Sequence, residues 1–245
     1  QVADADWGTL AHDLAWSPAE LWLALRTAAI DREVQRFLGS GHSFRQVVIL
    51  GAGLDTRAER FSTANVRFFE VDHPASQADK KARLAALGDY PVDAATYVSC
   101  DFEKERFLET LVAAGFSTEE PAFFVWEGVV LYLPEAAVRA TMRAVARGCH
   151  DRSVLMFDYV GKAMAEGSVD DRDQKLRDLL ADLVEPVKFG TDDVLPVLHE
   201  EGFRWVHTRN FDEICLDFTG TYERERKFRF QRLALASRTP PPDFG

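Results

Sequence analysis

Short apolar runs recur along the chain, and most of them end at a glycine or an acidic residue that is followed by a helical pattern. Five such runs lie at residues 47–50, 66–71, 95–99, 121–126 and 153–159, and two more follow at residues 203–208 and 228–237. A short continuous apolar run bounded by turn residues indicates a buried strand. Strands that alternate with helices indicate an α/β fold with a parallel sheet. The pattern predicts a seven-stranded, mostly parallel sheet with helices on both faces.

The first predicted helix has three agreeing start signals. Ser17 is a suitable N-cap, Pro18 suits the first turn, and Glu20 can close a capping box. We expect this helix to end near Leu38, because Gly39 follows it. Further helices are predicted at residues 74–87, 104–113, 135–148 and 191–202.

Besides the charged connection expected at residues 209–227, two segments lie outside this alternation. Residues 1–17 contain Trp7 and Trp16, and we expect them to form an N-terminal arm, either packed over a pocket or as an ordinary strap. Residues 160–190 include a polar helical stretch dense in Asp and Arg, which is either a lid or substrate-binding insertion or a solvated helix pair. No linker or internal repeat divides the chain, so we expect a single domain over residues 1–245.

The first apolar strand leads directly into Gly51, Ala52 and Gly53. In open α/β sheets the ligand lies beyond the carboxyl ends of the strands, and glycine lets the backbone approach it. A dinucleotide site of the G-x-G-x-x-G type would need a third glycine where Thr56 stands. Asp55 also places a negative charge where a pyrophosphate would bind a helix N-terminus. The turn therefore favours a cationic or zwitterionic ligand.

Acidic residues follow the next two predicted strands. Asp72 lies about 20 residues after the glycine turn, where doubly wound folds place a carboxylate on ribose hydroxyls. It can equally cap the helix that begins at Pro74, and Glu70, two residues earlier, is a second candidate on the same side. Asp101 and Phe102 could hold an adenine, with the carboxylate on the exocyclic amine and the ring as an apolar wall. Alternatively, Asp101 caps the next helix and Phe102 belongs to the core.

Glu127 ends the most apolar strand, residues 121–126. An acid at the tip of a buried strand is costly unless it has a ligand or a partner, so Glu127 is a candidate site residue. Arg26 lies between Leu25 and Thr27 in an otherwise apolar turn of the first helix. Taken alone, such an arginine is expected to extend its guanidinium to solvent.

Composition narrows the class of protein. The chain has 245 residues, 47% of them hydrophobic, and a net charge of −11 without a basic stripe, which argues against nucleic acid or an anionic membrane as a partner. No apolar run approaches the roughly 20 residues of a membrane span, and no signal peptide is visible. The three cysteines are far apart and lack C-x-x-C spacing, so we expect neither a zinc site nor disulfides. These features predict a cytoplasmic protein whose partner is a small ligand or a protein tail.

Three motifs carry a specific resemblance: LGAGLDTR at residues 50–57, FEVDHP at residues 69–74 and WEGVVLYLP at residues 126–134. Together they resemble the leucine carboxyl methyltransferase family, which also includes bacterial O-methyltransferases of secondary metabolism. The resemblance covers residues 21–159 and continues more loosely toward residue 245, whereas residues 1–17 show no clear match. It implies the class I methyltransferase fold, which is Rossmann-like, and S-adenosyl-L-methionine as the cofactor.

The resemblance also implies a set of cofactor-binding residues: Arg26, Gly51, Ala52, Gly53, Asp72, Asp101, Phe102 and Glu127. In this assignment Arg26 binds the methionine carboxylate, and Glu127 contacts the amine. Asp72 binds the ribose, and the acid–aromatic pair after the third strand holds the adenine. The solvent-facing interpretation of Arg26 is thereby reversed.

We therefore expect an S-adenosyl-L-methionine-dependent O-methyltransferase that acts on a carboxylate or hydroxyl of a small molecule, for example a polyketide. A carboxylate acceptor is already a nucleophile, whereas a phenol or alcohol benefits from a general base. The sequence does not rank the candidates for that base, which are His73, Tyr132, Asp158, His207 and Tyr222. The pattern requires no metal.

Three alternatives remain open from the sequence. The acceptor can be a protein C-terminal carboxylate in place of a small molecule. The sheet can belong to a nicotinamide-dependent oxidoreductase, although Thr56 and Asp55 count against it. The chain can also be a non-catalytic module that keeps the fold and the cofactor pocket.

Overall fold

A computed structural model describes residues 18–39, 44–87, 91–166, 186–222 and 228–241. The predicted arm at residues 1–17 and most of the predicted lid, residues 167–185, lie outside the described residues. Among the described helices, none combines the length and the apolar character that crossing a bilayer requires.

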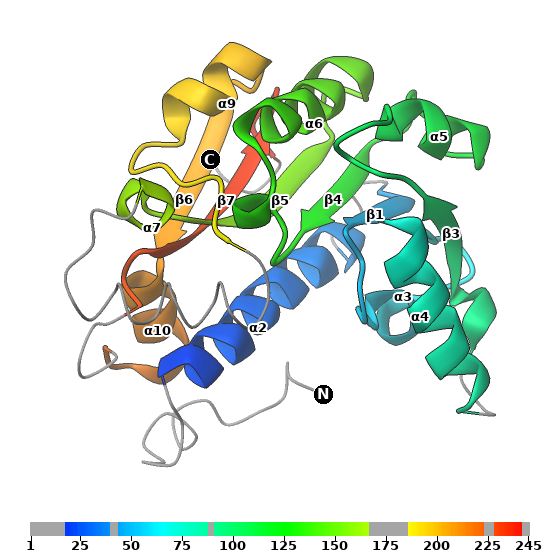
Figure 1. Cartoon of the computed structure of the whole chain (residues 1–245), viewed down its shortest axis with the longest axis horizontal. Helices are drawn as coiled ribbons and strands as arrows, with labels where there is room; N and C mark the ends of the chain where they lie inside the picture. Colours follow the sequence, from blue (N-terminus) through cyan, green and yellow to red (C-terminus); the bar gives the residue numbers. More distant parts are fainter. Residues whose placement is uncertain (1–17, 40–43, 88–90, 167–185, 223–227, 242–245) are drawn as a thin grey trace.

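The described residues form one seven-stranded sheet, as the apolar pattern predicts (Figure 1). Its strands are β1 Gln46–Leu50, β2 Arg67–Asp72, β3 Ala95–Ser99, β4 Ala122–Trp126, β5 Val154–Val160, β6 Trp205–Asn210 and β7 Gln231–Ser237. The spatial order is β3-β2-β1-β4-β5-β7-β6, and only β7 runs antiparallel to its neighbours. The order reverses direction between β1 and β4, so the switch point of the sheet lies between these two strands.

Helices cover both faces of the sheet. The principal helices are α2 Pro18–Gly39, α3 Arg57–Phe61, α4 Pro74–Ala85, α5 Phe107–Ala113, α6 Glu135–Gly148, α7 Lys162–Glu166, α9 Leu195–Glu201 and α10 Phe211–Thr219. Helices α2, α3 and α10 contribute to the core on one face, and α5, α6 and α9 contribute to the core on the other (Figure 1). Short 3-10 turns lie at Val92–Ala94 (η1) and Val130–Tyr132 (η2).

The two cores are built from alternate residues of the same strands. In β4, Phe123 and Val125 pack on the α2 face, whereas Phe124 and Trp126 pack on the α6 face. Successive side chains of a strand point to opposite faces, so a strand buried on both sides reads as a continuous apolar run. This explains why residues 121–126 contain no polar side chain.

The structure corrects three predicted boundaries or elements. Helix α5 begins at Phe107 and not at Lys104, because Arg106 has an extended backbone. Helix α9 begins at Leu195 and not at Thr191, because the Thr191 hydroxyl and the Asp193 carboxylate accept backbone N–H bonds in a preceding turn. Helix α10 lies in a segment that the sequence pattern treats as a charged connection.

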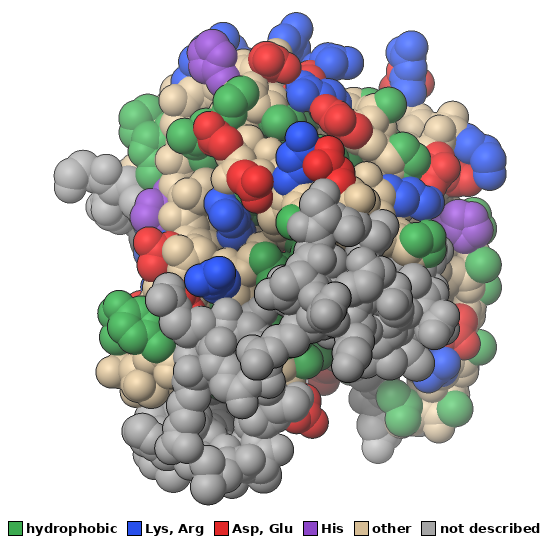
Figure 2. All heavy atoms as spheres, turned by 60° about the vertical axis from the view of Figure 1, so that its left-hand side comes forward, with side chains coloured by type: hydrophobic (Ala, Val, Ile, Leu, Met, Phe, Trp, Pro, Cys, Tyr) green, Lys and Arg blue, Asp and Glu red, His purple; other side chains and the backbone are tan. Residues whose placement is uncertain are grey.

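Acidic and basic side chains are interspersed on the described part of the surface shown in Figure 2. Neither sign of charge forms a continuous stripe on this face.

Candidate functional site

The turn after β1 is shaped by two glycines with left-handed backbone conformations. Gly51 has φ 67° and Gly53 has φ 46°. A Cβ atom on Gly51 would lie 2.5 Å from Cγ2 of Val129, so the turn also packs closely against the segment after β4. Glycine at position 51 therefore satisfies both a backbone and a packing requirement.

Asp72 fixes this turn from the neighbouring strand. Its Oδ2 accepts a hydrogen bond of 2.7 Å from the Gly53 N–H, and its Oδ1 accepts one of 2.7 Å from the His73 N–H. The residue that caps α4 is His73 and not Asp72, because His73 Nδ1 accepts the Ala75 N–H at the start of this helix. Asp72 thus ties the end of β2 to the glycine turn, and its contact with a ribose stays a prediction.

Glu127, directly after β4, lies between two arginines. Its Oε1 accepts hydrogen bonds from Arg26 Nε at 2.9 Å and from the Thr27 hydroxyl at 2.8 Å, and its Oε2 lies 2.6 Å from Arg57 Nη2. Burial acts to raise the pKa of Glu127, but Arg57 and Arg26 outweigh it and hold the pKa below its usual range. Glu127 is therefore an ionised carboxylate at the switch point of the sheet.

Arg57 is buried and connects four elements of the site. Its Nε donates to Asp31 on α2 at 2.7 Å, its Nη1 pairs with Asp55 in the glycine turn, and its Nη2 pairs with Glu127. Burial lowers the pKa of Arg57, but the three carboxylates, led by Glu127, outweigh this and raise it. Arg57 stays charged and holds the glycine turn, α2 and the end of β4 in one arrangement.

Arg26 is also paired and does not extend into solvent. Beside its bond to Glu127, its Nη1 donates to Asp158 Oδ2 at 2.9 Å. Asp158, at 1% exposure, is buried near the end of β5, and its Oδ1 accepts the Gly128 N–H at 2.6 Å. Burial lowers the pKa of Arg26, but Asp158 and Glu127 raise it overall.

A cleft of about 420 Å³ lies above these residues. Its lining comes from α2, the glycine turn, α3 and the segment after β4, and includes Arg26, Gly51, Ala52, Gly53, Arg57 and Glu127. Small-molecule sites have volumes of roughly 300–1,000 Å³ and few converging polar groups, which this cleft matches. Five of the eight predicted cofactor residues line it.

The predicted adenine pair lies farther along the same edge of the sheet. The Asp101 carboxylate binds Lys104 Nζ at 2.7 Å and the Glu103 N–H at 3.0 Å, and lies 4.0 Å from His73 Nε2. Phe102 packs near Phe107 and Trp126 and lines a separate hollow between α5 and α6. The structure therefore places this pair beside β3, while neither residue lines the cleft at the glycine turn.

Two sequence interpretations change with the structure. Glu70 was a second ribose candidate, but its carboxylate is buried and accepts a 2.6 Å bond from Lys80 Nζ. The Asp55 carboxylate was expected to present its charge to a ligand, but it is directed at Arg57. The acidic character of the glycine turn is thus largely neutralised within the protein.

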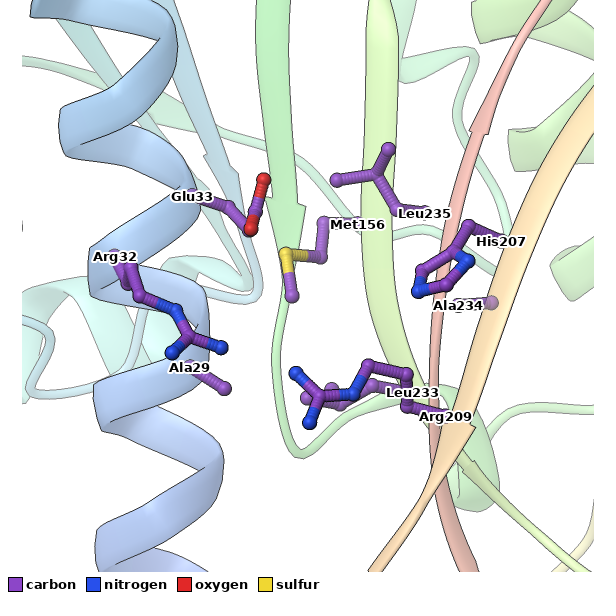
Figure 3. Close-up of a pocket in the computed structure, with 9 residues that line it drawn as sticks. All are labelled: Ala29, Arg32, Glu33, Met156, His207, Arg209, Leu233, Ala234 and Leu235. Atoms are coloured by element: carbon purple, nitrogen blue, oxygen red, sulfur yellow. The ribbon is translucent and has the colours of Figure 1, made fainter. Parts of the chain in front are cut away.

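The candidates for a general base are spread over the molecule. His207 lines a different cavity of about 200 Å³, between α2 and strands β5, β7 and β6, together with Met156 and Leu235 (Figure 3). Tyr132 ends the short turn η2, and Tyr222 is 53% exposed beyond α10. Asp158, in contrast, contacts Arg26 in the cleft.

Sequence reasoning missed three residues of this site: Thr27, Asp31 and Arg57. Arg57 belongs to the motif at residues 50–57 but was given no role. Its signal was the Asp55-x-Arg57 spacing, which lets the carboxylate accept both the backbone and the guanidinium of Arg57. Thr27 and Asp31 gave no such signal, because their role depends on how α2 packs over the strand ends.

The fold and the cleft together define a class. The solved structure of a methyltransferase-like protein from Thermobifida fusca has a TM-score of 0.65 at 14% identity, covering 91% of this chain and 84% of that chain. A magnesium protoporphyrin IX methyltransferase from Synechocystis, solved with S-adenosylhomocysteine, has a TM-score of 0.56 at 14% identity, covering 96% and 93%. The fold is that of class I methyltransferases.

The sequence model of the leucine carboxyl methyltransferase family matches residues 6–146. The chain belongs to this family. The match begins within residues 1–17, where no family motif had been found.

Named relatives agree with this assignment. A protein of Parafrankia sp., named as an S-adenosyl-L-methionine-dependent methyltransferase, is 35% identical over 151 residues, which are 61% of this chain and 47% of the relative. A similarly named protein of Mycolicibacterium vanbaalenii is 33% identical over 160 residues, covering 65% and 50%. The matched part thus spans about half the length of these relatives.

Proposed function

We propose that the chain is an S-adenosyl-L-methionine-dependent O-methyltransferase that acts on a carboxylate or hydroxyl of a small molecule. One observation carries the proposal: a guanidinium and an ionised carboxylate, from Arg26 and Glu127, lie side by side in a cleft at the switch point. This pair is complementary to a ligand with a carboxylate and an ammonium group on one carbon.

The described residues fit such a cofactor. The backbone at Gly51 and Gly53 carries no side chain, so a ligand can approach it closely. Arg26 would bind the carboxylate of the methionine part and Glu127 its ammonium group, while Asp72 holds the turn in place. When bound, the cofactor would supply an electrophilic methyl group, and the residues around it would set its position relative to the acceptor oxygen.

The charges around the cleft favour an acceptor that is already ionised. Among the described lining residues, the Asp55 and Glu127 carboxylates are both paired with arginines. A paired carboxylate is a poor proton acceptor, because protonation would break the ion pair. A carboxylate acceptor needs no such proton transfer. The name of the family to which the chain belongs also refers to a carboxyl acceptor.

The test is a transfer assay with methyl-labelled S-adenosyl-L-methionine and three acceptor sets: small carboxylic acids, phenols, and peptides with a free C-terminus. Label in base-labile methyl esters of small acids is the expected result. Label only in the peptides would favour the protein carboxyl alternative, and label only in nitrogen or carbon positions would contradict O-methylation. Arg26→Ala, assayed in parallel, should lose transfer to every acceptor.

Two other readouts separate the remaining alternatives. Quenched or enhanced nicotinamide fluorescence on mixing with NADH would support an oxidoreductase. Tight binding of S-adenosyl-L-methionine without transfer to any of the three acceptor sets would support a non-catalytic binding module.

A further inference from the structure

Asp158 is a buried acid that contacts the cleft residue Arg26. It belongs to β5, one strand beyond Glu127, and both of its carboxylate oxygens are used. Oδ2 accepts from Arg26 Nη1 at 2.9 Å, and Oδ1 accepts from the Gly128 N–H at 2.6 Å. Asp158 therefore joins the guanidinium on α2 to the backbone just after β4.

Arg26 is held from two sides by this arrangement. The Glu127 carboxylate accepts a hydrogen bond from Nε, and the Asp158 carboxylate accepts one from Nη1. Hydrogen bonds to the described residues therefore use two of the five N–H donors of the guanidinium. Gly128, at φ 71°, is so close to the guanidinium that a Cβ atom there would lie 3.4 Å from Nη2. The position of the guanidinium is thus fixed, while its three other donors form no hydrogen bond within the described part of the chain and can serve a ligand.

Burying the Asp158 carboxylate costs free energy, and the hydrogen bonds from Arg26 and Gly128 offset this cost. Burial raises the pKa of Asp158, and Arg26 and the Gly128 N–H act against it, while Glu127 adds to the rise. A buried carboxylate is stable only with strong donors in good geometry. Asp158 and Arg26 are therefore expected to stay together whether or not a ligand is bound.

We propose that Asp158 is a positioning residue that holds the Arg26 guanidinium partly away from Glu127 and ready for the carboxylate of an amino-acid-bearing ligand. This inference rests on the proposed function, because it takes the ligand to be S-adenosyl-L-methionine. Without the second carboxylate, Arg26 would pair with Glu127 alone. The guanidinium would then be free to turn further donors toward Glu127, and the ligand would have to displace these added bonds before its own carboxylate and ammonium could bind.

Asp158→Asn tests the proposal with nearly unchanged side-chain volume. The asparagine replaces one carboxylate oxygen with an NH₂ group, which cannot accept a hydrogen bond. Because Arg26 and the Gly128 N–H bind different oxygens of Asp158, one of these two donors loses its acceptor. The variant and the wild type are titrated calorimetrically with S-adenosylhomocysteine and with 5′-methylthioadenosine, which lacks the amino-acid part. We expect the variant to bind S-adenosylhomocysteine about tenfold more weakly, as for a lost charge-assisted hydrogen bond, with 5′-methylthioadenosine affinity unchanged.

Asp217→Asn is the matched control. Like Asp158, Asp217 pairs with arginine side chains, but its partners Arg32 and Arg209 line the cavity of Figure 3 and not the cleft. This variant should keep the wild-type ratio of the two affinities. A conservative variant, Asp158→Glu, moves the carboxylate by one methylene. It should lower the affinity for S-adenosylhomocysteine relative to that for 5′-methylthioadenosine, and it provides the test if Asp158→Asn does not fold.

The outcomes separate the two proposals. If the wild type binds S-adenosylhomocysteine and the ratio of affinities is unchanged in both Asp158 variants, the positioning role is wrong and the methyltransferase proposal stands. If the wild type binds neither adenosyl compound, the methyltransferase proposal fails and the positioning role fails with it.

Discussion

Arg57 shows how much one side chain contributes to the site. It is 1% exposed and is surrounded by the carboxylates of Asp31, Asp55 and Glu127. Each of these acids comes from a different part of the chain. Because its planar guanidinium offers several donors in fixed directions, arginine can hold all three, whereas lysine cannot.

Arg57→Leu should destabilise the protein by about 3–5 kcal/mol, because it leaves buried carboxylates without their partner. Denaturant unfolding measures this change in free energy. Arg83→Leu is the control, because Arg83 pairs with Asp79 at the exposed surface, and it should change stability by no more than about 0.5 kcal/mol. Equal effects of the two substitutions would contradict the role given to Arg57.

Glu127 should make stability depend on pH in a defined direction. Its pKa is lowered in the folded protein, so its ion pairs stabilise fully above the ordinary value of 4.5 and are lost as pH falls through the folded pKa. The difference in melting temperature between wild type and Glu127→Gln should therefore be largest near neutral pH and shrink below about pH 4.5. A difference that grows on acidification would contradict the ionised state of Glu127.

The glycine turn allows a matched comparison of two positive-φ positions. Gly51→Ala introduces backbone strain and a Cβ atom 2.5 Å from Val129 Cγ2. Gly53→Ala introduces strain, but its Cβ atom meets no atom of the described residues within 4 Å. We expect about 1–2 kcal/mol of destabilisation for Gly53→Ala and about 1–3 kcal/mol more for Gly51→Ala. Thermal unfolding of both variants measures this, and equal losses would mean that contact with Val129 does not matter.

At the scale of elements, α10 is the clearest failure of the sequence pattern. The Asn210 side chain accepts the Glu213 N–H at 3.0 Å, and the Glu213 carboxylate accepts the Asn210 N–H at 2.7 Å. At the other end of the helix, Gly220 has φ 72°. These cap residues were readable in the sequence. The high charge of residues 209–227 is more typical of a connection, so the pattern of apolar positions predicts no helix there.

Asn210→Ala should destabilise the protein by about 1 kcal/mol, because it removes the side-chain acceptor of the cap. Asn210→Asp keeps an acceptor at the same place and should be close to wild type. Urea unfolding of the two variants gives the comparison. A loss of equal size in both would assign the effect to something other than the cap.

The strands, by contrast, followed directly from the sequence. The apolar runs of the central strands β1 and β4 are continuous because both faces of the sheet are buried there. All seven strands lie within a few residues of the predicted ranges. Contacts between distant elements could not be predicted in this way. The pairing of Arg26 with Asp158 joins residues 132 positions apart, and no local spacing encodes it.

For the whole molecule, the strand order decides which predicted residues meet. Because β1 and β4 are neighbours, the glycine turn and Glu127 face one cleft together with Arg26 from α2. Asp72 is one strand away and acts through Gly53, and Asp101 is two strands away along the same edge. The sequence therefore predicted the edge of the sheet on which the site lies, while the ion pairs within it required the structure.

The most direct test of the account is calorimetric titration of the protein with S-adenosyl-L-methionine, S-adenosylhomocysteine and NAD in parallel. We predict micromolar binding of the two adenosyl ligands and no detectable binding of NAD, because the cleft presents Arg26 and Glu127 to an amino-acid group. Binding of NAD without the adenosyl ligands would mean that the turn after β1 holds a pyrophosphate, and it would contradict the methyltransferase proposal.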